Sequence, residues 1–231
     1  MASFSDDGVS PVGYVAGTST VPSIQMTSGT IATTPYDGAF EYNTPLFYCT
    51  PQSTERGILR TDQTYRLDFE RNGSASTSMQ NFFDVGVTLS SSTVYYFRFD
   101  FFLSSLSNPG GSLSITIRFT GTATLNNIGY TFYGTFAGSN VSLNATNNIC
   151  SGFSTTAGNQ LLSALTVAGT VNSYMTITGT VSVNAGGTFI PQYNTQNAGI
   201  TYKTNSGSTF MICPIGAAGS TTSVGTWAAE S

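Results

Sequence analysis

Residues 174–183 read YMTITGTVSV, and the spacing of their apolar side chains decides the fold class of the chain. Polar and apolar residues alternate along the stretch, which is the period of two expected for a half-buried antiparallel strand. The apolar face consists of Met175, Ile177, Val181 and Val183, and the polar face of Tyr174, Thr176, Thr178, Thr180 and Ser182. Residues 184–187, NAGG, form a predicted turn, because glycine and asparagine reach positive φ at low cost. The pattern predicts a long strand leading into an antiparallel hairpin.

Two further strands are predicted after this turn. Residues 188–193, TFIPQY, form the return strand. Pro191 places it at a sheet edge or turns its N–H side outward, because proline cannot donate a ladder hydrogen bond. A second turn near residues 205–207 leads to a closing strand over residues 209–215, TFMICPI.

The most aromatic strand is predicted at residues 94–103. One face is predicted to enter the core and contains Tyr95, Phe97, Phe99, Phe101 and Leu103. The other face carries Tyr96, Arg98, Asp100 and Phe102. Two aromatic rings around an Arg–Asp pair suit burial against a neighbouring subunit, so Tyr96, Arg98 and Phe102 are candidate interface residues.

Weaker alternation predicts the remaining strands. Residues 64–70 are expected to form one strand, with Tyr65, Leu67 and Phe69 on one face and charged residues on the other. Residues 112–120, 128–136 and 141–143 are also predicted strands. Residues 161–167 form either a strand or a short helix, since NQLLSAL contains good helix formers.

The two ends of the chain lack the pattern of a self-sufficient core. Residues 1–25 are expected to form an extended arm that orders on a partner or stays loose. Residues 39–42 and 46–49 predict a small hairpin that cannot stand alone. Its aromatic residues, and the single tryptophan of the tail, are candidate attachment residues: Phe40, Tyr42, Phe47, Tyr48 and Trp227. The predicted divisions are an arm and hairpin over 1–62, a β-sandwich over 63–216 and a flexible tail over 217–231.

Charge is sparse and unevenly placed. Charged residues make up 8% of the chain, against about 25% in ordinary soluble domains. After Phe101 the only charged residues are Arg118, Lys203 and Glu230. The second half therefore meets water through a neutral polar surface or contacts another chain. Sixteen Phe and twelve Tyr residues favour the second interpretation as much as the first.

Several chemistries are excluded or disfavoured by composition. The chain contains no histidine, which excludes a Ser-His-Asp or Cys-His nucleophile and a histidine metal site. No basic run supports nucleic-acid binding, and no apolar run is long enough to span a membrane. The first residues have no signal-peptide pattern. Cys49, Cys150 and Cys213 are expected to be free thiols formed in a reducing cytoplasm. We expect no enzyme activity, no cofactor and no metal, although a carboxylate pair such as Glu41 with Asp62 stays open.

Two segments carry a resemblance to known proteins. Residues 183–193, VNAGGTFIPQY, and residues 207–216, GSTFMICPIG, resemble the last strands of the C1q/TNF-like jelly rolls of bacteriophage virion proteins. That resemblance implies a homotrimer that builds fibres, spikes or surface decorations on particles.

The hairpin region resembles a module of phage fibre and minor virion proteins with the pattern G-A-x-E-Y, then L-F-Y-x-T-P, then R-G. The matching residues are Gly38, Ala39, Glu41, Tyr42, Leu46, Phe47, Tyr48, Thr50, Pro51, Arg56 and Gly57. In that setting the module lies between an attachment end and a distal head.

These observations lead to one expectation and two alternatives. We expect an all-β, antiparallel jelly-roll sandwich that forms a homotrimer and serves as a non-enzymatic fibre or spike component of a phage virion, made in the host cytoplasm. Its partners are then other capsid or tail proteins and, where the protein contacts the host, a surface glycan. The alternatives are a capsid decoration (cement) protein and a carbohydrate-binding adhesin module.

Overall fold

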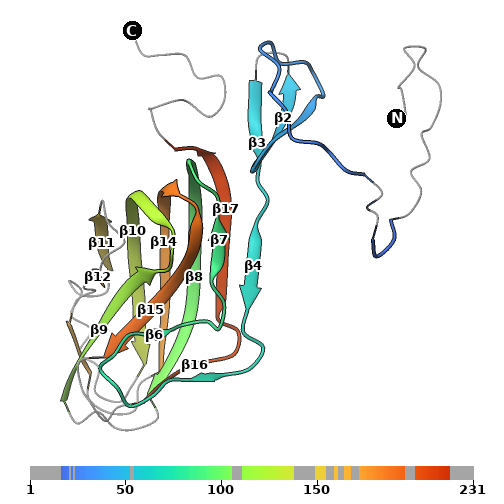
Figure 1. Ribbon diagram of the computed structural model, residues 1–231. Coiled ribbons are helices and arrows are strands. Elements are labelled where there is room, and N and C mark those ends of the chain that lie inside the picture. Colours follow the sequence, from blue (N-terminus) through green and yellow to red (C-terminus); the bar gives the residue numbers. More distant parts are fainter. Residues whose placement is uncertain are drawn as a thin grey trace.

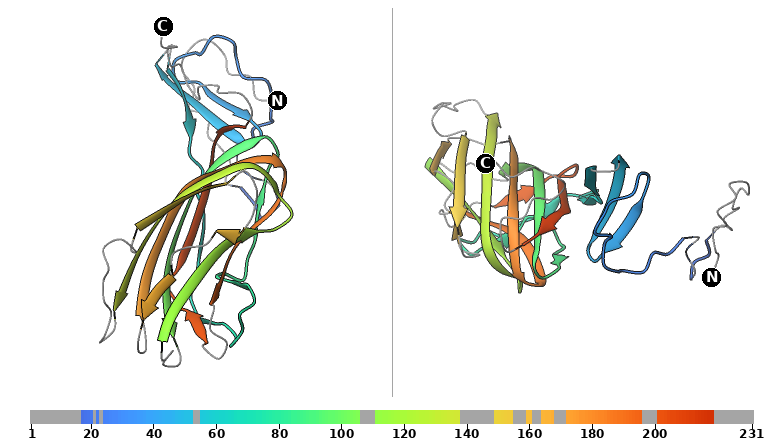
Figure 2. Two further views of the ribbon diagram at one scale, coloured as in Figure 1. Left: turned by 90° about the vertical axis from the view of Figure 1, so that its left-hand side faces the viewer. Right: turned by 90° about the horizontal axis from the view of Figure 1, so that it is seen from above.

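The computed structural model describes residues 17–20, 22, 24–52, 55–105, 111–137, 149–154, 159–160, 164–167, 172–195 and 201–218. Within these ranges the regular elements are β-strands, with no helix (Figure 1). Every strand pairing is antiparallel. Two sheets pack face to face as a sandwich, and a small third sheet lies beyond one end of it (Figure 2). The predicted all-β antiparallel sandwich is confirmed.

The larger sheet of the sandwich has eight strands and is built around β8. One edge of β8 pairs with β14, which continues to β10 and β11, and the other edge pairs with β17 and β16, which continue to β4 and β5. The strands are β4 (Gln63–Arg66), β5 (Arg71–Asn72), β8 (Thr93–Ser105), β10 (Thr124–Ala137), β11 (Ile149–Ser154), β14 (Asn172–Ala185), β16 (Tyr202–Thr204) and β17 (Thr209–Ala217). The strands predicted at 94–103, 128–136, 174–183 and 209–215 are therefore confirmed.

The second sheet has six strands, with β9 and β15 at its centre. Its strands are β6 (Gln80–Asn81), β7 (Val87–Leu89), β9 (Gly111–Thr120), β12 (Asn159–Gln160), β13 (Ala164–Val167) and β15 (Gly187–Thr195). The predicted strands at 112–120 and 188–193 are confirmed, and the described part of 161–167 is strand rather than helix. The candidate strand at 141–143 lies outside the described residues.

Pro191 does not place β15 at an edge of the sheet. β15 pairs with β9 on one side and with β6 and β7 on the other. The Pro191 carbonyl accepts a hydrogen bond from the Phe82 N–H at 3.2 Å, in the gap between β6 and β7. The ladder is interrupted there, so the missing proline donor leaves no paired position unfilled.

Phenylalanine dominates the core between the two sheets. Phe97, Phe99 and Phe101 of β8 are completely buried, and Phe119 of β9 stacks on Phe189 of β15 with ring centroids 5.2 Å apart. The predicted apolar face of β14, Met175, Ile177, Val181 and Val183, is also completely buried. Burial of one such side chain contributes about 1.5–3 kcal/mol, so this alternation accounts for much of the drive to fold.

The predicted strand over residues 64–70 is wrong in its second half. β4 ends at Arg66, and the chain bends at residues 68–69. Leu67 is buried because its N–H donates to Ser208 O and its carbonyl accepts from Gly207 N–H. Phe69 is 85% exposed instead of entering the core. The alternation of Tyr65, Leu67 and Phe69 could not reveal this bend, because residues 205–208 impose it from the far end of the chain.

The small sheet has three strands, whereas the sequence predicted two. β1 (Phe40–Asn43) and β2 (Leu46–Gln52) form the predicted hairpin, and β3 (Glu55–Leu59) adds a third strand. Residues 60–62 then run to β4 (Figure 1). β3 was missed because ERGIL contains a glycine and no clear alternation.

Candidate functional site

The outer face of the larger sheet is defined by Tyr96, Arg98, Asp100, Phe102 and their neighbours across the ladder. It carries the three interface candidates predicted on β8. Residues 95–103 of β8 alternate between buried and more exposed positions as predicted. Thr176 and Tyr174 of β14 lie opposite Asp100 and Phe102. These side chains therefore share one surface.

Asp100 is the polar centre of this face. Its Oδ1 accepts hydrogen bonds from the Tyr174 hydroxyl and the Thr176 hydroxyl, each at 2.7 Å. The Arg98 Nε donates to Oδ2 at 2.7 Å. Partial burial works to raise the pKa of Asp100, but the hydrogen bonds from Arg98, Thr176 and Tyr174 outweigh it, and the pKa lies below its usual value. The charge is thus paired within the chain.

Large aromatic side chains lie on the same face of the sheet as this polar centre. Phe102 packs on Tyr174 with ring centroids 5.0 Å apart and is still 40% exposed. Tyr133 of β10 lies opposite Thr176, and Phe153 of β11 lies opposite Gly129. Tyr133 is 48% exposed and Phe153 is 71% exposed. A sheet face that exposes several large rings and carries a paired charge has the chemistry of a protein interface.

Tyr96, the third candidate on this face, is partly covered within the chain. The Arg60 guanidinium lies 5.2 Å from the centroid of the Tyr96 ring. Cys213 lies opposite Tyr96 in the ladder and is completely buried. Arg98 and Phe102 are open to a partner, whereas Tyr96 first meets the segment that leads to the small sheet.

One face of the small sheet carries three of its four predicted attachment residues. Tyr42 stacks on Phe47 with ring centroids 4.4 Å apart, and the ladder places Phe40 on the same face. Leu59 lies opposite Phe47 and joins this face. Phe40 is 61% exposed. Tyr48 alternates to the opposite face, where burial raises its pKa, so the four residues do not form one surface.

The opposite face of the small sheet binds the segment that precedes β1, at Ala32. The Arg56 Nε lies 2.8 Å from Glu41 Oε2 in a largely buried ion pair. Glu41 Oε1 accepts the Ala32 N–H, and Arg56 Nη2 donates to the Ala32 carbonyl, both at 2.6 Å. Glu41 is committed to Arg56 and Asp62 to Arg60, so these two carboxylates do not form a pair with each other.

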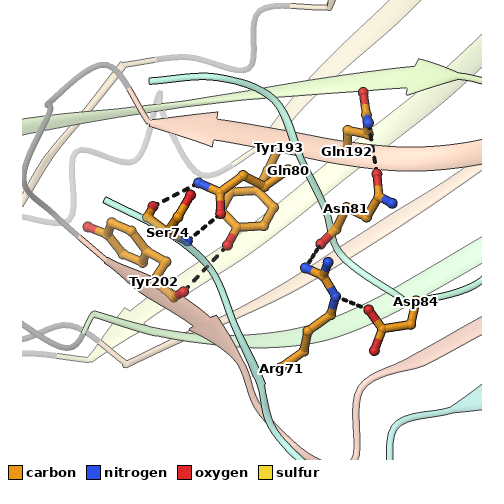
Figure 3. Close-up of polar contacts among 8 residues, drawn as sticks. All are labelled: Arg71, Ser74, Gln80, Asn81, Asp84, Gln192, Tyr193 and Tyr202. Carbon is orange, nitrogen blue, oxygen red and sulfur yellow. Dashed lines mark hydrogen bonds and ion pairs between the residues drawn. The ribbon is translucent and has the colours of Figure 1, made fainter. Parts of the chain in front are cut away.

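A cluster of polar contacts that was not predicted holds the segment between β5 and β7 against the sandwich (Figure 3). Arg71 forms an ion pair with Asp84 and donates to the Asn81 carbonyl at 2.5 Å. Gln192 donates to the Asn81 side chain at 2.7 Å. Burial raises the pKa of Tyr193 to about 12. No sequence motif marks this cluster, because its members come together only when β15 packs beside β6.

The other expected features have mixed outcomes. Cys49 and Cys213 are free thiols, as predicted, while the side chain of Cys150 lies outside the described residues. Trp227 also lies outside them. In the part of the chain that the structure describes, no three metal-binding side chains gather at one place, and no helix could cross a membrane.

Comparisons of this chain with protein-family models, curated proteins and solved structures found no match.

Proposed function

We propose that the protein is a non-enzymatic structural component of the outer surface of a phage particle and works there as a homotrimeric fibre or spike protein. The observation that carries this proposal is the outer face of the larger sheet, where Phe102 and Tyr133 are exposed near the paired Asp100 and Phe153 is exposed farther across the same face. A face of this kind suits contact with other copies of the chain.

The strand order supports the finer proposal of a jelly roll. With β5, β10, β11 and β16 set aside, eight strands can be counted in chain order: β4, β6 with β7, β8, β9, β12 with β13, β14, β15 and β17. The first, eighth, third and sixth are neighbours in the larger sheet, and the second, seventh, fourth and fifth are neighbours in the other. Eight strands in two interleaved Greek keys make a jelly roll. The β10–β11 hairpin extends the larger sheet beyond this pattern.

The electrostatics of the outer face favour self-association. Removal of an unpaired charge from water is costly, whereas a charge already satisfied within its own chain can enter an interface with less penalty. Arg98, Tyr174 and Thr176 already satisfy Asp100. The rings beside it provide the apolar area that a stable contact needs.

The virion setting is supported by the two resemblances noted in the sequence. They cover the small sheet and the β14–β15–β17 end of the sandwich. In this proposal the small sheet, through Phe40, Tyr42 and Phe47, binds another virion protein of the capsid or tail. The protein is made in the host cytoplasm and is then incorporated into the particle.

Light scattering on purified variants tests the homotrimer. We expect the wild-type chain to have three times the 24.3 kDa mass of one chain, and Phe102→Asp to shift the protein toward monomers. Phe69→Asp is the matched control, because Phe69 is also exposed but lies on the bend after β4. A wild-type monomer at micromolar concentration, or equal dissociation of both variants, would contradict the proposal. Electron microscopy of intact particles with antibody-labelled protein then tests the virion location.

A glycan-binding role is the second candidate, and one observation favours it. The outer face combines exposed aromatic rings with hydroxyl and carboxylate groups, which is also the chemistry that holds sugars. A glycan array distinguishes the two roles: binding that is lost in Phe102→Asp while the trimer persists would favour the adhesin. Labelling over the head instead of the tail would favour the cement-protein alternative.

A further inference from the structure

The connection between the small sheet and the sandwich is short. β3 ends at Leu59 and β4 begins at Gln63, so residues 60–62 form the whole link (Figure 1). Arg60, Thr61 and Asp62 are all exposed to solvent. The small sheet also contacts the sandwich directly through β2 and β17, so its orientation depends on that contact together with the contacts of the link.

Two side chains of the link supply such contacts on the outer face of the larger sheet. The Arg60 guanidinium lies over the Tyr96 ring, 5.2 Å from its centroid. Arg60 also pairs with Asp62 at 3.2 Å. Arg60 and Asp62 both lie near enough to the Cys213 thiol to shift its pKa, Asp62 upward and Arg60 downward.

The burial of Cys213 shows how closely the link fits. Cys213 lies opposite Tyr96 in the β8–β17 ladder, and its neighbour Ile212 points into the core. Alternation therefore directs the Cys213 side chain to the outer face, where it would be accessible on a bare sheet. Its exposed fraction is nevertheless 0%. Asp62 lies beside Cys213 where the β4–β17 register continues, Arg60 lies over the neighbouring Tyr96 ring, and β2 also contacts β17.

We propose that Arg60 and Asp62 form a latch on Tyr96 and Cys213, which holds the small sheet in one orientation on the sandwich and shields the Cys213 thiol. When the latch opens, the Cys213 thiol becomes accessible to reagents in solution. This device belongs to the single chain and does not depend on the proposed virion role.

Alkylation with iodoacetamide, quantified for each cysteine by mass spectrometry, tests the shielding. The Cys213 thiolate displaces iodide and forms a thioether. We expect Arg60→Ala to speed modification of Cys213 by about tenfold, as loss of a cation–π contact and a hydrogen bond would predict. Arg66→Ala is the matched control, since Arg66 pairs with Asp68 and does not touch Cys213.

Whether the alkylation rate rises or falls in Arg60→Ala shows whether Arg60 shields the Cys213 thiol or only shifts its pKa. Burial raises the pKa of the Cys213 thiol, and Arg60 acts to lower it. Removal of Arg60 without opening of the latch would therefore leave less thiolate and slow the reaction. A rate in Arg60→Ala that is equal to or below the wild-type rate would overturn the proposal.

Two further measurements test whether the reagent reaches the thiol by latch opening or by a different route. The rate should be nearly independent of low urea concentrations, because latch opening exposes little surface; a steep dependence would indicate unfolding of β17 and contradict the latch. Tyr96→Leu, which removes the ring but keeps the strand, should also speed modification.

Small-angle scattering should give a broader distance distribution for Arg60→Ala than for Arg66→Ala. An unchanged distribution would refute the orienting role.

Discussion

Substitution of Gly179 by alanine should strongly destabilise the sandwich. Gly179 lies in β14 between Gly129–Tyr130 of β10 and Phe97 of β8. A Cβ at this position would lie 2.3 Å from the Gly129 carbonyl oxygen and 2.7 Å from the Phe97 ring. The nearest obstacle is backbone in the centre of the sheet, so neither β10 nor β8 can move away cheaply.

The expected cost follows from this overpacking. Forcing an extra carbon into a packed core costs about 1–3 kcal/mol, and an obstacle made of backbone places Gly179→Ala at the upper end, near 3 kcal/mol. With a urea slope of about 2 kcal/mol per M, the unfolding midpoint should fall by about 1.5 M. Far-UV circular dichroism at one fixed protein concentration measures the midpoint.

Gly129→Ala is the matched control on the neighbouring strand. There the added Cβ would meet only the Phe153 ring, at 3.7 Å, which is ordinary van der Waals contact. Its free energy of unfolding should stay within about 0.5 kcal/mol of wild type or rise slightly. Equal midpoints for Gly179→Ala and Gly129→Ala would refute the reasoning.

Four further predictions concern other parts of the protein. The folded protein holds the pKa of Asp100 below its usual value. The ionised Asp100 therefore stabilises the fold fully above the unfolded-state pKa, and this stabilisation is lost as pH falls through the folded-state pKa. In an acid titration, the Asp100→Asn variant should lack this decrease in stability. Tyr193 stays protonated in the folded protein until about pH 12, whereas the unfolded chain ionises near 10.0, so stability should fall across that interval, and less steeply in Tyr193→Phe. Unfolding in the presence of a thiol reagent should titrate three free groups per chain, one for each cysteine; a count of one would reveal a disulfide. Deletion of residues 1–60 should leave a folded trimer with nearly unchanged melting temperature that no longer joins particles and whose Cys213 reacts rapidly; full incorporation of the truncated protein would move the attachment role to the Trp227 tail.

The sequence alone was sufficient for the class of fold and for the core face of its central strands. Strict alternation in β8 and β14 identified Phe97, Phe99, Met175 and Ile177 as core, because a strand offers only two faces and the apolar set can occupy one of them. The same periodicity placed Arg98 and Phe102 together on the outer face. These predictions depend only on neighbours along one strand.

The features decided by tertiary structure are those in which distant segments meet. Phe69 is exposed because residues 205–208 bend the chain after β4. Pro191 is accommodated inside a sheet because β6 and β7 leave a gap opposite it. Cys213 is buried on an outward-facing position where Arg60 lies over the adjacent Tyr96 ring and β2 contacts β17. Each outcome depends on a contact between residues far apart in the chain, and local periodicity carries no information about which distant segment will arrive.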